Sequence, residues 1–165
     1  MILAQTGLEV RQLYSERDDR VLFAELCFTL NAGDVLQIAG PNGSGKTSLL
    51  RILAGLSSRY QGDILWHKHS LEQQRADYLQ QLLYIGHGAG IKAALSPLEN
   101  LRWSCALRGL PADDTPILSA LAKVGLRGFE EQACYSLSAG QQRRVNLARL
   151  FCIPAQLWIL DEPFT

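Results

Sequence analysis

The chain has 165 residues with 16 basic and 16 acidic side chains, so it carries no formal net charge at neutral pH. This length fits one domain with a substantial core, and the charge balance argues against the broad basic field of non-specific nucleic-acid binding. Four well-separated cysteines without a CxxC pair favour a reduced, cytosolic protein, and no apolar run approaches the roughly 20 residues that cross a bilayer. We therefore expect any polyanion to be bound locally.

Four segments have the patterns of strands. Residues 8–13 (LEVRQL) and 24–33 (AELCFTLNAG) alternate apolar and polar side chains, which predicts antiparallel edge strands. Residues 34–40 (DVLQIAG) and 157–162 (LWILDE) are instead short apolar runs that each lead into a polar motif. Such runs are typical of strands buried on both faces of a parallel sheet.

The remaining elements are mainly helical. Apolar spacing predicts a helix at residues 47–56, closed by Gly55, and a strand begins at Gly62. Residues 96–111 contain strong helix signals, with Ser96 as N-cap, Pro97 at the first helical position and Glu99 three residues after the cap. A further helix is predicted at 116–124. We expect an α/β core with a helical subdomain at residues 88–150, all within one domain, 1–165.

The stretch GPNGSGKT, Gly40–Thr47, matches the P-loop pattern and stands between a predicted buried strand and a predicted helix. Its glycines allow backbone N–H groups to face a β-phosphate at a helix N-terminus, where the dipole favours an anion. Lys46 then reaches the β- and γ-phosphate oxygens, and Thr47 offers its hydroxyl to Mg²⁺. A glycine-rich turn with an incidental lysine is the structural alternative. The predicted phosphate-binding residues are Gly40, Pro41, Asn42, Gly43, Ser44, Gly45, Lys46, Thr47 and Ser48.

Asp161 and Glu162 stand at the carboxyl end of the predicted strand at residues 157–162. An isolated carboxylate is costly to desolvate there, and a metal ion with its water would compensate for that cost. Asp161 suits the Mg²⁺ shell, and Glu162 suits polarisation of the water that attacks the γ-phosphate. The alternative for such a pair is a helix cap or a solvated loop.

The stretch LSAGQ, residues 137–141, has two interpretations. Ser138 can be an ordinary N-cap, with Arg143, Arg144 and Arg149 solvated on the helix that follows. However, the order of P-loop, LSAGQ and an apolar strand ending in Asp-Glu resembles that of ATP-binding cassette (ABC) ATPases. The resemblance implies an α/β P-loop NTPase of the ABC-cassette type, with a mostly parallel sheet core, antiparallel edge strands and a helical subdomain.

The resemblance also implies partners and roles. In that family the LSAGQ loop contacts the γ-phosphate held by a second subunit, so two cassettes close head to tail around two ATP molecules. Matched residue by residue, Ser138, Gly140 and Gln141 would make these contacts in a homodimer, while Lys46 and Glu162 act in hydrolysis. The family's integral-membrane permease subunits are the other expected partners, and nucleic acid is not one.

Within the family, several stretches resemble the ATP-binding subunit of bacterial haem exporters of cytochrome c maturation. The most specific is YIGHGAGIK, because cassette ATPases usually have Gln where His87 stands. The resemblance implies a coupling role for His87 near the attacking water, with a structural histidine as the alternative, and permease docking near Gly86–Arg102. It also implies a peripheral location on the cytoplasmic face of the cell inner membrane.

Three rival functions stay open at this point. The chain could be a soluble cassette ATPase of DNA repair or ribosomes, although heptads and a second cassette are absent from the sequence, or a transporter ATPase for another substrate. A GTPase or small-molecule kinase would share only the P-loop. The family continues beyond the loop where Thr165 stands, with further strands, helices and a switch histidine. We therefore expect a cassette whose C-terminal part is missing, with weak nucleotide binding and little hydrolysis by these 165 residues alone.

Overall fold

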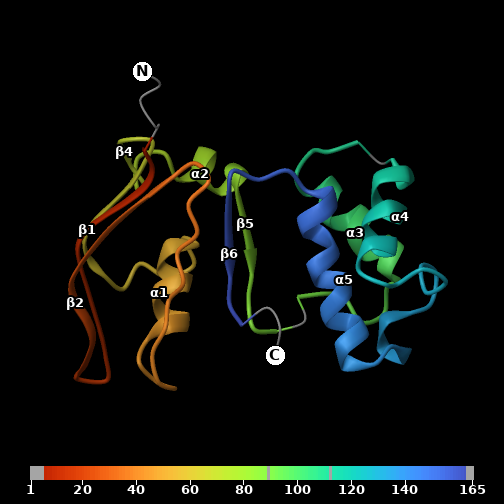
Figure 1. The fold of residues 1–165 in the computed structure, drawn as a ribbon, viewed down its shortest axis with the longest axis horizontal. Coiled ribbons are helices and arrows are strands. Elements are labelled where there is room, and N and C mark those ends of the chain that lie inside the picture. The colour runs from red at the N-terminus through yellow and green to blue at the C-terminus, as the bar shows by residue number, and fades with distance from the viewer. Residues whose placement is uncertain (1–5, 89, 112, 163–165) are drawn as a thin grey trace. The chain divides into compact units, whose positions relative to one another are not determined.

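The computed structural model describes residues 6–88, 90–111 and 113–162 (Figure 1). The chain forms two compact units, Met1–Gln80 and Gln81–Thr165, which are considered separately. In chain order the elements are β1 (Thr6–Arg17), β2 (Arg20–Asn31), α1 (Lys46–Leu53), β3 (Gln61–Trp66), β4 (His69–Ser70), α2 (Arg75–Gln81), β5 (Leu82–Ile85), α3 (Pro97–Ala106), α4 (Asp114–Lys123), a 3-10 turn (Cys134–Ser136), α5 (Ala139–Cys152) and β6 (Leu157–Leu160).

The first unit is built on a four-stranded antiparallel sheet with the order β2-β1-β3-β4. The antiparallel pairing predicted for the first two strands is confirmed. Of these two strands, β2 is at an edge of the sheet, whereas β1 lies inside it, between β2 and β3. A tight turn joins them at Asp18 and Asp19, whose φ angles of 51° and 59° suit a hairpin turn. On β1 the side chains of Leu8, Val10 and Leu13 are buried.

A bulge interrupts the pairing of β1 with β3, and a glycine makes it possible. The register shifts between Arg11 and Tyr14, and Gln12 has a φ of 47°. Opposite this point Gly62 has a φ of 97°, and a Cβ there would lie 2.4 Å from the carbonyl oxygen of Gln12. Any side chain at Gly62 would therefore collide with the backbone of β1.

Helices α1 and α2 belong to the same unit, and Tyr78 of α2 connects them. Its ring is fully buried, with the ring edge against Trp66, and its hydroxyl donates a 2.6 Å hydrogen bond to the carbonyl of Leu53 at the end of α1. Burial raises the pKa of this hydroxyl, so it stays a neutral donor. Helix α1 ends as predicted, with Gly55 in the left-handed conformation at a φ of 69°.

The prediction of a strand at residues 34–40 is wrong. This segment has no strand hydrogen bonds, and Val35 is 95% exposed while Leu36 is 44% exposed. A central strand of a parallel sheet needs a hydrogen-bonded neighbour on each side, and the described residues supply none to this segment. Its apolar sequence is therefore not buried, and the P-loop follows an extended, unpaired segment.

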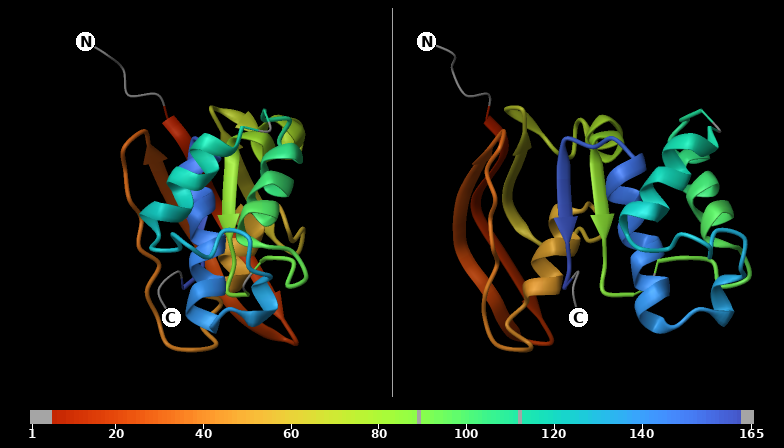
Figure 2. Two further views of the ribbon diagram at one scale, coloured as in Figure 1. Left: turned by 90° about the vertical axis from the view of Figure 1, so that its right-hand side faces the viewer. Right: turned by 45° about the vertical axis from the view of Figure 1, so that its right-hand side comes forward.

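The second unit combines the parallel pair β5 and β6 with helices α3, α4 and α5, which pack together (Figures 1 and 2). The parallel pairing predicted for residues 157–162 is confirmed for Leu157–Leu160, but burial on both faces is not, because Trp158 is 53% exposed. None of the helices in the described ranges has the length and hydropathy of a membrane span. The core consists of Leu83, Leu98, Leu101, Cys105, Ile117, Ala120, Leu121, Leu126, Cys134, Leu137, Val145, Ala148 and Ile153.

Helix α3 begins as its sequence predicts. The Ser96 hydroxyl accepts from the backbone N–H of Glu99, and the Glu99 carboxylate accepts from the backbone N–H of Ser96, which forms a capping box. Helix α4 begins at Asp114, two residues before the predicted Pro116, because Asp113 caps it by accepting from the N–H of Thr115.

Candidate functional site

The P-loop folds as a tight turn that leads directly into α1. The N–H of Ser44 donates to the carbonyl of Pro41 over 3.2 Å, and Gly43 adopts a left-handed φ of 80°. The Lys46 ammonium curls back to donate to the carbonyls of Gly40 (2.8 Å) and Pro41 (3.0 Å). The Lys46 ammonium is therefore held against the backbone of the P-loop itself.

The first turn of α1 lacks the groups that usually complete a helix start. Gly45 is the N-cap and has no side chain to accept a hydrogen bond, and the first turn contains no acidic residue. Gly45 has a φ of 94°, and a Cβ there would lie 3.0 Å from the Cβ of Leu22 on β2. The helix start is therefore backed closely by β2, and its N–H groups with their positive dipole end suit an anion. Thr47 is exposed beside this turn, and Ser48 is half-buried.

Asp161 and Glu162 follow β6 directly but lie in different surroundings. The N–H of Asp161 donates to the carbonyl of Ile85 over 2.8 Å, which extends the pairing with β5, and the residue is 3% exposed. Glu162 leaves the sheet with a left-handed φ of 48°, and its side chain is 43% exposed. Asp161 is thus buried at the end of the sheet with its backbone paired to β5, while Glu162 is turned outward from a strained backbone.

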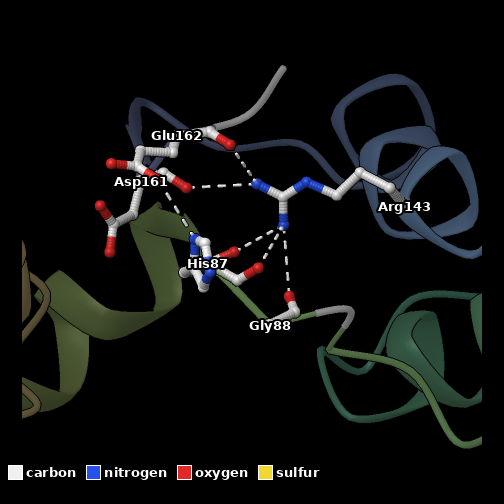
Figure 3. Close-up of polar contacts among 6 residues, drawn as sticks. His87, Gly88, Arg143, Asp161 and Glu162 are labelled. Atoms are coloured by element: carbon white, nitrogen blue, oxygen red, sulfur yellow. Dashed lines mark hydrogen bonds and ion pairs between the residues drawn. The ribbon is translucent and has the colours of Figure 1, made fainter. Parts of the chain in front are cut away.

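His87 lies beside Glu162 in the loop that follows β5. Its Nδ1 atom is 3.3 Å from the Oε2 atom of Glu162, and its ring is 73% exposed (Figure 3). Neutral imidazole can donate a hydrogen bond to this carboxylate through one nitrogen while the other remains available to a water.

Arg143 of α5 holds the backbone of both segments that carry these side chains (Figure 3). Its Nη1 atom donates to the carbonyls of Gly86 (2.7 Å), Gly88 (3.2 Å) and His87 (3.4 Å). Its Nη2 atom donates to the carbonyls of Glu162 (2.8 Å) and Asp161 (3.2 Å). A single guanidinium therefore joins the loop after β5, the turn after β6 and helix α5.

The start of α5 is another helix N-terminus without negative charge. The Ser138 hydroxyl accepts from the N–H of Gln141 (3.2 Å), and the Gln141 side-chain oxygen accepts from the N–H of Ser138 (2.8 Å). The structural interpretation of Ser138 as an N-cap is thus confirmed. Gly140 is exposed, with open space where a Cβ would stand, and the first turn has no acidic residue.

The loop before α3 is secured by a buried amide. Asn100 is 3% exposed; its Oδ1 atom accepts from the N–H of Lys92 (2.7 Å), and its Nδ2 atom donates to the carbonyls of Lys92 and Ser96, each over 3.0 Å. The ammonium of Lys92 lies 4.4 Å from the ring centroid of Trp103, a cation–π contact on the surface of α3. These contacts fix the backbone from Lys92 to Ser96 ahead of α3.

Comparisons with known proteins identify the family. The sequence profile described as ABC transporter matches residues 23–165. The chain belongs to the ABC transporter family. Cytochrome c biogenesis ATP-binding export proteins named CcmA are similar to this cassette along nearly its whole length: those of Hahella chejuensis and Escherichia coli O6:H1 are 52% and 55% identical over 96% of the chain and 74% of their own length. The protein of the same name from Pseudomonas putida KT2440 is 58% identical over 96% of the chain and 75% of its length.

Solved structures agree with the cassette fold. An ABC transporter ATP-binding protein from Pyrococcus furiosus superposes with a TM-score of 0.84 at 26% identity, covering 95% of this chain and 76% of that one. A second ATP-binding subunit of an ABC transporter superposes with a TM-score of 0.85 over 96% of this chain and 67% of the other; at 24% identity this likeness concerns the fold alone. The fold class predicted from the sequence is confirmed.

The predicted site residues of the cassette fall into three groups. Residues 40–48 form the turn and the start of α1 in the first unit, whereas His87, Asp161 and Glu162 lie around one end of the β5–β6 pair in the second. Ser138, Gly140 and Gln141 form the start of α5. Two of the groups stand at the start of a helix, α1 or α5, and the third follows the ends of strands β5 and β6.

Sequence reasoning missed Arg143 and Asn100. Arg143 was considered only as a solvated residue, and its five carbonyl contacts depend on loops that lie 18 and more positions away along the chain. Asn100 carried a clearer signal, because a buried helix with an amide on its apolar face needs a polar partner for that amide. The partner is the backbone of the loop that begins after His87.

Proposed function

We propose that this chain is the nucleotide-binding part of an ABC transporter ATPase subunit that acts in cytochrome c biogenesis, in the export of haem. The observation that carries the proposal is the 52–58% identity to CcmA proteins over 96% of the chain. The three motifs of the cassette, each at the end of a strand or the start of a helix, support ATP hydrolysis as the reaction. The cargo itself is proposed from the relatives' names.

The P-loop would hold the triphosphate of ATP. The N–H groups at the start of α1 point where an anion is favoured, and neither a capping side chain nor an acidic residue competes for them. On binding, Lys46 would exchange the carbonyls of Gly40 and Pro41 for the β- and γ-phosphate oxygens, with the other residues of 40–48 enclosing the phosphates.

Thr47 and Asp161 fit a Mg²⁺ ion by the chemistry of their donors, since a hydroxyl and a buried carboxylate are the hard oxygen ligands that this ion prefers. When bound, Mg²⁺ neutralises charge on the phosphates during phosphoryl transfer. Glu162 would polarise the attacking water through its half-exposed carboxylate, and His87, 3.3 Å from that carboxylate, would orient Glu162 and the water. Lys46, Glu162 and His87 are thus the proposed catalytic residues.

The start of α5 would serve the ATP of a second copy of the chain. Ser138, Gly140 and Gln141 lie at an exposed, uncharged helix N-terminus, which suits the γ-phosphate presented by a partner. Two copies arranged head to tail would then share two ATP molecules. Hydrolysis would require the dimer.

Integral-membrane permease subunits are the proposed second partner. The segment Gly86–Arg102 connects His87 to α3, at the edge of the predicted helical subdomain of residues 88–150. Trp103 and Leu107 next to this segment are 45% and 66% exposed, which suits an apolar contact. Docking there would keep the subunit at the cytoplasmic face of the inner membrane.

A gene replacement in a bacterium that makes c-type cytochromes tests the proposal. Deletion of the gene for the intact subunit should abolish haem staining of cytochromes on denaturing gels, and the wild-type gene should restore it. Lys46→Ala should not restore it although the protein accumulates. Normal cytochrome maturation in the deletion strain would contradict the haem assignment and favour a transporter ATPase for another substrate.

Membrane fractionation of the same strains separates the transporter from a soluble cassette ATPase. The tagged intact subunit should sediment with inner membranes and be recovered with a hydrophobic partner after mild detergent extraction. Recovery in the soluble fraction with ribosomes or DNA would contradict the proposal and favour the soluble alternative.

A further inference from the structure

Arg143 makes an unusual set of contacts for a helix-surface arginine. Its guanidinium donates to five backbone carbonyls, with Nη1 on the loop Gly86–Gly88 and Nη2 on Asp161 and Glu162. Figure 3 shows the two nitrogens of the fork turned toward these two segments. The planar guanidinium suits this division, because its donors point outward in fixed directions.

The contacts fall where the backbone needs support. Glu162 has a left-handed φ of 48°, a conformation that costs a non-glycine residue free energy and persists only when its surroundings hold it. The 2.8 Å hydrogen bond from Arg143 to the carbonyl of Glu162 provides such support. The same guanidinium holds the carbonyl of Gly86, at the point where β5 ends and the loop of His87 begins.

We propose that Arg143 is a positioning residue that sets the Glu162 carboxylate and the His87 ring relative to each other and ties both to helix α5. The inference rests on the proposed function, in which Glu162 polarises the attacking water. Arg143 acts through the backbone carbonyls of both segments, to which its guanidinium donates.

The same contacts link the start of α5 to the backbone of Glu162. Ser138 and Gln141, which would meet the partner's ATP, precede Arg143 in the same helix. A shift of α5 on dimer closure would therefore pull on the carbonyls of Glu162 and Gly86 through one rigid side chain. Contact of α5 with the partner's ATP would in this way adjust the position of Glu162, which polarises the attacking water at the chain's own ATP.

The neighbouring arginine supplies a matched control. Arg144 also lies on α5 and also donates to backbone carbonyls, those of Val124 (3.3 Å) and Gly125 (3.2 Å). These acceptors belong to the end of α4, away from the loop of His87 and the turn of Glu162. Loss of either arginine removes a surface guanidinium from the same helix, but only Arg143 connects to the hydrolytic residues.

The test uses the intact subunit assembled with its permease, in three variants: Arg143→Gln, Arg143→Lys and Arg144→Gln. Since small misplacements of reacting groups cost up to about 100-fold in rate, Arg143→Gln should lower kcat by about 10- to 100-fold with KM for ATP within about threefold of wild type. Arg143→Lys, with one ammonium in place of the fork, should recover only part of the rate. Arg144→Gln should keep the wild-type kcat.

Hydrogen–deuterium exchange provides a readout independent of turnover. In Arg143→Gln, and more weakly in Arg143→Lys, peptides covering residues 82–88 and 157–162 should exchange faster, whereas Arg144→Gln should leave them unchanged. A kcat for Arg143→Gln equal to that of Arg144→Gln, or unchanged exchange in both peptides, would overturn the proposal. If Arg143→Gln does not fold, the same two criteria apply to Arg143→Lys. An inactive wild-type enzyme would contradict the proposed function, while the exchange result would still decide whether Arg143 fixes the two segments.

Discussion

Helices α3 and α5 begin with the same capping box but differ in charge. Each has a serine at the N-cap whose hydroxyl accepts from the N–H three residues later, and each has a side chain at that later position that accepts from the serine N–H. In α3 the later residue is Glu99, and the N-cap Ser96 is 3% exposed. In α5 it is the neutral Gln141, and Ser138 is exposed.

This difference means that the start of α3 has a structural role only, whereas the start of α5 can also bind a ligand. The Glu99 carboxylate already occupies the positive end of the α3 dipole, and the surrounding core excludes solvent from Ser96. At α5 the hydrogen bonds of the cap are satisfied, but the dipole is not compensated by any acidic side chain in the first turn. The start of α5 is therefore capped by hydrogen bonds, yet its positive dipole end can still attract an anion.

Adding a negative charge at the start of α5 should have the largest effect. Gln141→Glu would give α5 the capping box of α3, stabilising the helix by about 0.3–1 kcal/mol while repelling a γ-phosphate. We expect ATP hydrolysis by the intact subunit to fall by about 10- to 100-fold, the equivalent of about 1.4–2.7 kcal/mol. Steady-state ATPase assays beside thermal unfolding measure both quantities.

The matched control for this variant is Glu99→Gln, which gives α3 the neutral cap of α5. It should lower stability by about 0.3–1 kcal/mol and leave hydrolysis unchanged. If Gln141→Glu hydrolyses ATP as fast as wild type, the start of α5 is a cap alone.

Asn100→Ala should cause the second largest change, on stability. The substitution leaves the N–H of Lys92 without the acceptor that Asn100 provides and removes the hydrogen bonds that the amide donates to the carbonyls of Lys92, Leu95 and Ser96, a loss of about 1–3 kcal/mol for a buried group. Urea unfolding monitored by circular dichroism gives the value. A change below about 0.5 kcal/mol, the range of ordinary surface substitutions, would mean that Asn100 does not secure the start of α3.

Removing the two serine caps should cost about the same stability but have different functional effects. Ser96→Ala and Ser138→Ala should each destabilise the protein by about 1 kcal/mol, as loss of an N-cap hydroxyl typically does. Only Ser138→Ala should also weaken ATP-dependent dimer formation, which sedimentation measures. Equal dimer formation in the two variants would argue against a ligand role for Ser138.

The smallest expected effect is a pH dependence of thermal stability that arises from the pair of Arg102 on α3 and Asp114 on α4. Arg102 donates to Asp114 at the start of α4, and this hydrogen bond lowers the pKa of the Asp114 carboxyl from its ordinary value of 3.8. A lowered folded-state pKa means that the contribution is fully present above pH 3.8 and is lost as the pH falls through the lower value. Asp114→Asn should therefore show a slightly shallower loss of thermal stability below pH 4 than wild type, measured by calorimetry; parallel curves would contradict the pairing.

Local signals explain most of what the sequence predicted. The start of α3, the left-handed Gly55 and the antiparallel β1–β2 pair depend on neighbouring residues or one hairpin, so patterns of a few residues were sufficient. The strand expected at residues 34–40 failed because pairing depends on neighbours that this segment does not have among the described residues.

The candidate site shows the same division. The P-loop and the start of α5 are single stretches whose geometry follows from glycines and caps, whereas the His87–Glu162 pair needs β5 and β6 to align in parallel. Arg143 lay beyond sequence reasoning because its role requires the loop after β5, the turn after β6 and α5 to meet at one guanidinium.

The central claim is that the uncharged start of α5 receives the γ-phosphate of ATP bound to a second copy. Light scattering of the intact subunit carrying Glu162→Gln, which slows hydrolysis, measures this directly. The predicted result is a monomer without nucleotide, a dimer with ATP, and a monomer in both conditions once Gln141→Glu is added. A protein that binds ATP and stays monomeric, or a Gln141→Glu variant that dimerises equally well, would contradict the claim.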